Sequence, residues 1–146
     1  MQPGSSLDEK LILEQVLRQV LPAEVTPIVN PRKRAIAFFW GADNPQNVVE
    51  LFTSSEWKVL LALAESFPYY SPYEAMLSRL TSTSLDYCRE RIQEAAERGT
   101  LRQELGPIRD AFKKIRPKLR PFALTISSVY QLGYVLTTVS ASSYKE

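Results

Sequence analysis

The stretch Gly106–Leu136, GPIRDAFKKIRPKLRPFALTISSVYQLGYVL, holds a short helix with two distinct faces, followed by a hairpin. Its apolar residues recur at helical spacing and predict a single buried stripe: Ile108, Phe112, Ile115 and Leu119. Basic residues repeat at the same spacing, one position over: Arg109, Lys113, Arg116 and Arg120. We therefore predict an amphipathic helix over residues 107–120, with a basic stripe beside its buried one.

Positive charge is concentrated on this predicted helix. Residues 106–120 contain six Lys or Arg residues and one Asp, a balance of +5, whereas the whole chain carries +2, so the other residues sum to −3. A basic stripe on one helix is the pattern expected of an element that contacts phosphates. The alternative is a solvated helix face on a structural domain, which is the ordinary explanation for charged helices.

The residues after the helix predict two strands and a tight turn. Leu124–Tyr130 and Tyr134–Thr138 are rich in strand-forming residues, and we expect Gly133 to supply the turn between them. Pro117 has no backbone N–H, so we expect it to bend or end the helix near Lys114.

The N-terminal third predicts one helix and three strands. Ser6 and Glu9 form a capping box that opens a leucine-rich helix over residues 6–21. This helix either covers its own domain or forms a homodimer contact. Three β-branched or aromatic segments bounded by turn signals are predicted strands: Val25–Val29, Ala35–Trp40 and Val48–Phe52. The basic turn Arg32–Arg34 is either solvated or a supplementary phosphate contact.

The middle of the chain predicts three further helices. Capping boxes beginning at Thr53 and Ser71 open helices over residues 54–66 and 72–80, the second with Pro72 at its first position. Another helix, Leu85–Arg98, ends at Gly99 and turns Cys88 inward. Residues 100–105 are expected to be a link to the basic helix.

Three of these segments resemble the winged-helix effector domain of OmpR/PhoB-type transcription regulators. FTSSEWKVLLAL (52–63) resembles the L-T-x-x-E-F-x-L-L opening of the family's first core helix, and SPYEAML (71–77) its S-R-E-x-L motif. Residues 108–136 resemble the recognition helix and wing, V-D-x-x-I-x-x-L-R-x-K-L-x-P-x-G-x-x-I-x-T-V-R-G-x-G-Y-x-L. With the three preceding strands, the resemblance covers roughly Val25–Thr138.

The resemblance implies that the basic helix enters the major groove of DNA. Lys113, Lys114 and Arg116 occupy the positions that contact bases and phosphates in the family, and Arg109 replaces an acid. The expected DNA-binding residues are therefore Arg109, Lys113, Lys114, Arg116, Lys118 and Arg120. The family's wing arginines are replaced by Tyr130 and Val135, which puts a basic minor-groove contact in doubt; the candidate wing contacts are Tyr130 and Gln131.

Two departures concern other parts of the family's pattern. Leu85–Arg98 stands where the family has a loop that faces RNA polymerase, so this helix is either a modified partner surface or an insertion packed on the core. About 50 residues precede the first core helix, too few for the family's receiver domain.

The expected fold class is α+β: a winged helix-turn-helix with a small N-terminal antiparallel sheet, an added N-terminal helix and an extra helix before the recognition helix. We expect an N-terminal helical extension over residues 1–24, a winged-helix domain over 25–138 and a flexible tail over 139–146. The sequence is compatible with a whole protein and with a domain excised from a longer one.

The predicted function is sequence-specific binding of double-stranded DNA as a transcription regulator, with RNA polymerase as a further partner. The alternative is a winged-helix protein–protein adaptor with little or no DNA binding. We expect no enzymatic activity, cofactor or metal: histidine is absent, Cys88 is the only cysteine and the five glycines form no phosphate loop. No apolar run is long enough to span a membrane, so a cytoplasmic, nucleoid-associated location is expected.

Overall fold

The computed structural model describes residues 6–139 as an α+β arrangement. The helices are α1 (Ser6–Val20), α2 (Ser54–Ser66), α3 (Tyr73–Thr81), α4 (Leu85–Arg98), α5 (Leu101–Glu104) and α6 (Gly106–Leu119), with short 3-10 turns η1 (Pro31–Lys33) and η2 (Arg120–Phe122). The strands are β1 (Thr26–Asn30), β2 (Ala35–Phe39), β3 (Val48–Leu51), β4 (Ser71–Pro72), β5 (Leu124–Val129) and β6 (Gly133–Thr138). The predicted helices and strands are confirmed, most of them to within a residue at each end.

The strands form two antiparallel sheets. The N-terminal sheet has the order β1-β2-β3, and its register aligns Ile28 with Ala37 and Ala37 with Val49. The second sheet has the order β4-β6-β5, because the two residues of β4 pair with the start of β6. The chain between α2 and α3 is thereby joined to the C-terminal hairpin, a pairing that the sequence analysis did not predict.

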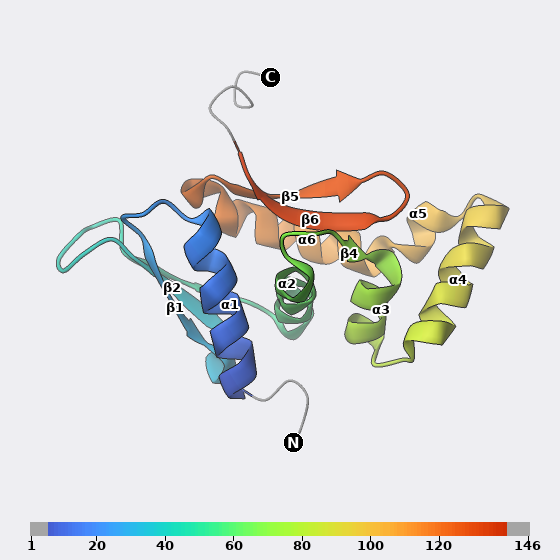
Figure 1. Ribbon diagram of the computed structural model, residues 1–146, viewed down its shortest axis with the longest axis horizontal. Coiled ribbons are helices and arrows are strands. Elements are labelled where there is room, and N and C mark those ends of the chain that lie inside the picture. Colours follow the sequence, from blue (N-terminus) through green and yellow to red (C-terminus); the bar gives the residue numbers. More distant parts are fainter. Residues whose placement is uncertain (1–5, 140–146) are drawn as a thin grey trace.

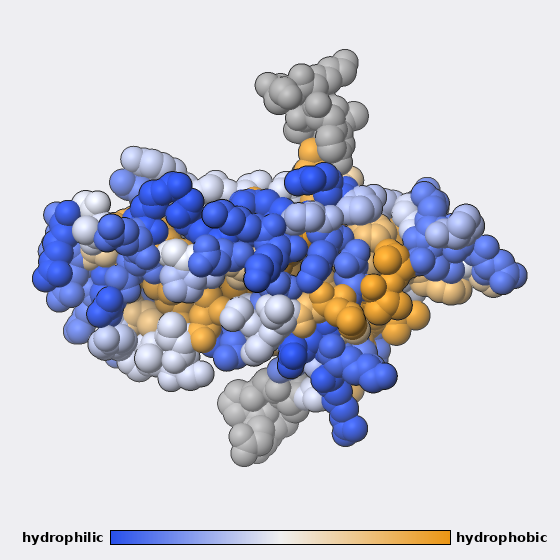
Figure 2. Space-filling model, turned by 180° about the vertical axis from the view of Figure 1, so that it is seen from behind, coloured by the Kyte–Doolittle hydropathy of each residue, from blue (hydrophilic) through white to orange (hydrophobic). Residues whose placement is uncertain are grey.

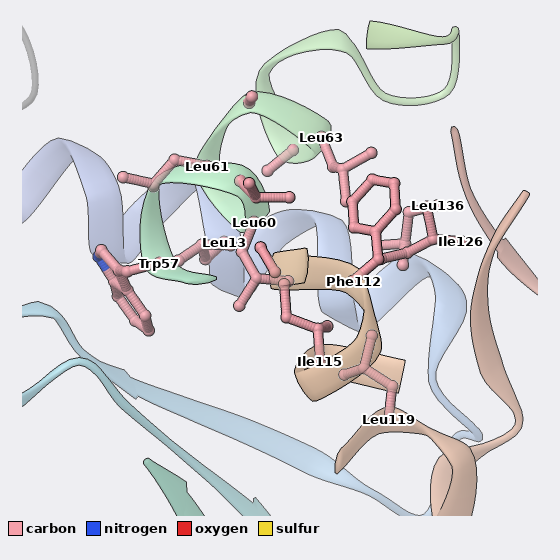
Figure 3. Packing of buried hydrophobic residues seen from close by; sticks show 14 of the residues in the cluster. Leu13, Trp57, Leu60, Leu61, Leu63, Phe112, Ile115, Leu119, Ile126 and Leu136 are labelled. Atoms are coloured by element: carbon pink, nitrogen blue, oxygen red, sulfur yellow. The ribbon is translucent and has the colours of Figure 1, made fainter. Parts of the chain in front are cut away.

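The core lies where α2, α3 and α6 meet beneath the β5–β6 hairpin (Figure 1). Figure 3 shows side chains from α2, α6 and the hairpin converging in one apolar cluster: Leu60, Leu63, Phe112, Ile115, Ile126 and Leu136. The predicted apolar stripe of α6 is confirmed, since Ile108, Phe112, Ile115 and Leu119 are all at most 1% exposed. Removing such side chains from water is the main contribution to folding.

The N-terminal helix and sheet extend the same core. Leu13, Val16 and Leu17 of α1 are buried within the cluster that contains α2 and α6. Glu14 of α1 is also buried, and its carboxylate accepts a hydrogen bond of 2.9 Å from the Val29 N–H of β1. At the other end of the sheet, the Phe122 ring stacks on Phe38 with centroids 4.0 Å apart.

Helix α4 lies on the outer side of α3, away from α2 (Figure 1). It begins after Ser84, whose hydroxyl accepts the Tyr87 N–H, and it ends at Gly99, which has φ +76°. Both termini are as predicted, and Cys88 is buried. The expected link over residues 100–105 contains the short helix α5.

Pro117 was expected to bend or end the helix near Lys114; α6 continues through Pro117, so it does not end there. The helix reaches Leu119, and the Arg120 N–H donates to the Arg116 carbonyl oxygen. Proline removes only the hydrogen bond that its own N–H would have made to Lys113, and the buried side chains on both sides of it, Ile115 and Leu119, hold the last turn in place.

The structure corrects two further local predictions. The hairpin turn is made by Tyr130–Leu132, where Gln131 has φ +60° and the Leu132 N–H donates to the Val129 oxygen. Gly133 lies in β6 instead, and a Cβ there would stand 2.0 Å from the Ser71 backbone oxygen. Ser71 does not cap α3: it belongs to β4, α3 begins at Tyr73, and no side chain caps it.

Candidate nucleic-acid interface

Helix α6 presents one exposed face between the hairpin and the α2–α3 pair. Its buried side contacts α2 and α3, and β5 packs along it. Pro107, Asp110, Lys113, Lys114 and Pro117 are exposed along the opposite side. Figure 2, the view from behind, shows a hydrophilic band along this helix. The face is therefore accessible to a large partner along the length of the helix.

Three cations on this face are free to contact an external anion. Lys113, Lys114 and Arg120 are exposed, and none of them takes part in an ion pair among residues 6–139. Lys113 and Lys114 are adjacent in the middle of the helix, whereas Arg120 lies at its end. Free lysine ammonium groups on a rigid helix are suited to phosphate oxygens.

Arg116 has an internal role as well as a charge. Its guanidinium donates a 3.0 Å hydrogen bond to the Ile126 carbonyl oxygen and lies 5.3 Å from the centroid of the Phe112 ring. These contacts tie α6 to β5. Arg116 is half-buried, and its guanidinium carries further N–H donors besides the one bonded to Ile126.

Lys118 follows Lys114 by one helical turn, and its charge is already used within the protein. Its ammonium lies 2.9 Å from Oε1 of Glu56, donates to the Leu51 carbonyl oxygen and stands 4.8 Å from the Phe52 ring centroid. The Glu56 side chain is 2% exposed. The charge of Lys118 is thus used to neutralise a buried carboxylate, and the net basic charge of the exposed face is smaller than the sequence count of +5.

Three arginines, Arg102, Arg109 and Arg116, lie near the buried Tyr134 of β6. Burial raises the pKa of the Tyr134 hydroxyl, and the charges of Arg109, Arg116 and Arg102 act in the opposite direction. Arg102 belongs to α5 and is exposed. Arg102 therefore lies near Tyr134 together with Arg109 and Arg116, although residues 100–105 were expected only to link two helices.

The wing turn is exposed and firmly attached. Tyr130 is 81% exposed, and Gln131 is also exposed. The Leu132 carbonyl accepts the Tyr73 N–H at 3.2 Å, and the Tyr73 hydroxyl is hydrogen-bonded to the backbone of Gln131. The turn is thus attached to the start of α3, and its side chains offer an aromatic ring and an amide instead of a positive charge.

A shallow cleft of about 420 Å³ borders Lys114. It is lined by the start of α2, the end of α3 and α6, including Thr53, Ser55, Thr81 and Asp110. The N–H groups of Thr53 and Glu56 are already bonded, because these two residues form the predicted reciprocal capping box. The Asp110 carboxylate would repel an anion at that end of the cleft, so Lys113 and Lys114 carry the attraction.

Residues 6–139 contain no group of His, Cys, Asp and Glu side chains suited to hold a metal ion. Within the same range, every helix is too short or too polar to cross a membrane.

Comparison with known proteins adds no further information about this surface. No protein-family model matches the chain, and searches of curated proteins and of solved structures find no significant match.

Proposed function

We propose that this protein binds double-stranded DNA through the exposed face of α6 and regulates transcription. The observation that carries the proposal is the pair Lys113 and Lys114, exposed and without an ion pair on a helix whose other side is locked into the core. Such a pair can neutralise two phosphates and release their counterions. Because its helix is held rigidly, little conformational entropy is lost on binding.

The order of elements supports a winged-helix arrangement. Apart from α4 and α5, which lie between α3 and α6, the elements α2, β4, α3, α6 and hairpin β5–β6 have the order expected of that fold, and β4 completes the sheet of the hairpin. Helix α6 would be the recognition helix in the major groove, which is wide enough for an α-helix. The hairpin would then lie over the neighbouring backbone.

The environments of the residues suggest separate roles. Lys113 and Lys114 are proposed to contact phosphates and base edges, and Arg120, Arg109 and Arg102 flank them as further phosphate contacts. Arg116 positions α6 against β5 through Ile126 and offers its other donors to DNA. Lys118 is left out because its ammonium is paired with Glu56. Tyr130 and Gln131 would reach a groove or backbone without adding charge.

The test is a titration of fluorescently labelled duplex DNA, followed by anisotropy over a series of salt concentrations. We expect wild-type binding to weaken steeply as salt rises. The variant K113A/K114A should bind more weakly at every salt concentration, with a log–log salt slope smaller by about 2, since each phosphate contact contributes about 0.9. The matched control, K58A/R98A, removes two charges from α2 and α4 and should bind like the wild type.

Two results would contradict the proposal. The first is an absence of wild-type binding at low salt. The second is equal loss of affinity in K113A/K114A and K58A/R98A, which would show a response to net charge alone. Circular dichroism of both variants is the necessary control, although substitutions of exposed lysines usually change stability by less than about 0.5 kcal/mol.

Helix α4 supports a second, compatible role as a protein contact. Its residues Leu85 and Tyr87 are 44% and 50% exposed on the outer side of α3. We propose helix α4 as the contact for RNA polymerase or another partner. L85A/Y87A should keep the affinity for DNA and lose the effect on transcription in an assay with purified polymerase. If L85A/Y87A regulates like the wild type, α4 is only a structural insertion.

A further inference from the structure

One face of the β1–β3 sheet is apolar and exposed. Alternation and register place eight uncharged residues on it: Thr26, Ile28, Asn30, Ala35, Ala37, Phe39, Val49 and Leu51. We call this the apolar sheet face. Ile28, Phe39, Val49 and Leu51 are between 41% and 63% exposed. Figure 2 shows an apolar area on the side of the molecule where this sheet lies.

This pattern differs from that of an ordinary surface sheet. An antiparallel sheet with one solvated face alternates apolar and polar residues along each strand. Here the covered face carries Val29, Ile36 and Phe38, and the open face is apolar as well. The exposed side chains of the apolar sheet face amount to roughly 400 Å², a size at which patches are commonly interaction sites.

The charges at the two ends of the sheet are opposite in sign. The β1–β2 turn carries Arg32 and Lys33, whereas the other end carries Glu24 before β1 and Asp43 after β2. All four are exposed, and no ion pair within residues 6–139 includes any of them. A copy of the chain turned end for end places its acidic end over the basic end of the first.

We propose that the apolar sheet face is a two-fold dimer interface between copies of this chain. The two-fold axis lies between the sheets and perpendicular to the strands, so the strands of the two copies run antiparallel. Val49 and Phe39 of one copy pack against the same face of the other, as in a two-layer sandwich. The apolar patch forms the centre of the interface, and the two charged ends form its polar rim.

The symmetry accounts for both features of the face. An isologous contact requires a surface that is complementary to itself. At the centre, apolar residues pack against the same apolar residues of the other copy. At each end, the acidic residues of one copy face the basic residues of the other, so the charge attraction occurs twice, once on each side of the axis. The free edge of β3 is short, and its last carbonyl, Leu51, is bonded by Lys118, so we place the contact on the face and not along the edge.

The proposal is tested by sedimentation equilibrium of the protein without DNA, between about 1 and 100 µM, where moderate dimers dissociate. We expect a concentration-dependent dimer. Val49→Lys should raise the dimer dissociation constant at least about tenfold, because it buries a charge at the centre of the interface. Leu85→Lys is the matched control: it places the same charge at an exposed leucine of α4 and should leave the dimer unchanged.

A charge-reversal set keeps the proposal testable if Val49→Lys fails to fold. R32E/K33E should weaken the dimer, and adding E24K/D43K should restore it, because the ends then attract again. A wild-type protein that remains monomeric throughout the concentration range overturns the proposal. So does a dimer that survives both Val49→Lys and R32E/K33E. None of these measurements depends on DNA binding, so they are independent of the proposed function.

Discussion

Lys113 and Lys118 lie on the same helix and have opposite surroundings. Lys113 is exposed and has no ion pair, whereas the ammonium of Lys118 is paired with the buried carboxylate of Glu56. A carboxylate buried without a partner would destabilise the folded state, so the ion pair with Lys118 is needed to keep Glu56 buried. The sequence predicted one role for both lysines because helical spacing gives the direction of a side chain but not what it meets.

Acid should destabilise the protein through Glu56. Burial alone would raise the pKa of Glu56, but hydrogen bonds from Lys118 and from the Thr53 N–H, with the Lys118 charge, hold it below its usual 4.5. Because the unfolded chain binds this proton more readily, the stabilisation is present above pH 4.5 and is lost as pH falls through the lowered pKa. Urea unfolding at a series of pH values measures the loss.

The variant Glu56→Gln separates this group from the other carboxyls. Its stability should depend less on pH below 4.5 than that of the wild type. Glu14, whose pKa is also lowered despite burial, remains titratable in the variant and keeps part of the dependence. Identical pH profiles for the two proteins would show that Glu56 has no such role.

Gly133 should be intolerant of any side chain. A Cβ would stand 2.0 Å from the Ser71 oxygen and 2.8 Å from its carbonyl carbon, both backbone atoms of β4. We expect Gly133→Ala to lower the free energy of unfolding by about 3 kcal/mol, at the upper end for overpacking. Gly106→Ala is the control, because a Cβ there meets no atom within 4 Å. Comparable stabilities of the two variants in urea would contradict this account of Gly133.

The sequence predicts the individual helices and strands well, but it does not predict which distant segments pair with each other. The helical stripe of α6 and the alternation in β5 and β6 are encoded in neighbouring residues, so the sequence was enough to predict them. Strand β4 has only two residues and exists because β6 lies beside it. Nothing in Ser71 and Pro72 alone distinguishes a strand from the first turn of a helix.

The last turn of α6 should become more stable without its proline. Pro117 is exposed, so its ring contributes little packing, and it lacks the N–H that would bond the Lys113 carbonyl. We expect Pro117→Ala to raise the free energy of unfolding by about 1–2 kcal/mol, less than the full cost of an interior proline because the unfolded chain also gains freedom. Chemical denaturation measures it. Pro121→Ala, at the start of η2, should give no such gain, and a loss of stability in Pro117→Ala would refute the argument.

At the scale of the whole molecule, the basic surface is an assembly of separate segments. Arg102 and Arg109 approach Tyr134 from α5 and α6, while Arg116 is held by β5. The sequence predicted the residues of α6 because they share one helix. It could not include Arg102, since the proximity of α5 to the hairpin depends on the complete fold.

Helix α1 should unfold together with the rest of the protein. Its apolar side chains belong to the common core, and the indole N–H of Trp57 in α2 donates to Glu9 at 3.1 Å. We expect urea unfolding followed by tryptophan fluorescence and by far-UV circular dichroism to give coincident single transitions. A chain that begins at Pro22 should lose several kcal/mol of stability, because α2 and β1 would be uncovered.

A separate early transition would show that α1 is an independent extension. That result would agree with the expected boundary between residues 24 and 25 and would contradict the shared core.

The buried thiol of Cys88 can be used to measure local opening of the protein. It is 4% exposed on the inner side of α4, with its sulfur 3.1 Å from the Thr83 hydroxyl, and the chain has no other cysteine. A thiol-specific reagent can therefore modify only this position, and burial makes its rate depend on local opening around Cys88. The labelling rate thus reports local opening around α4 in the native protein, without any substitution.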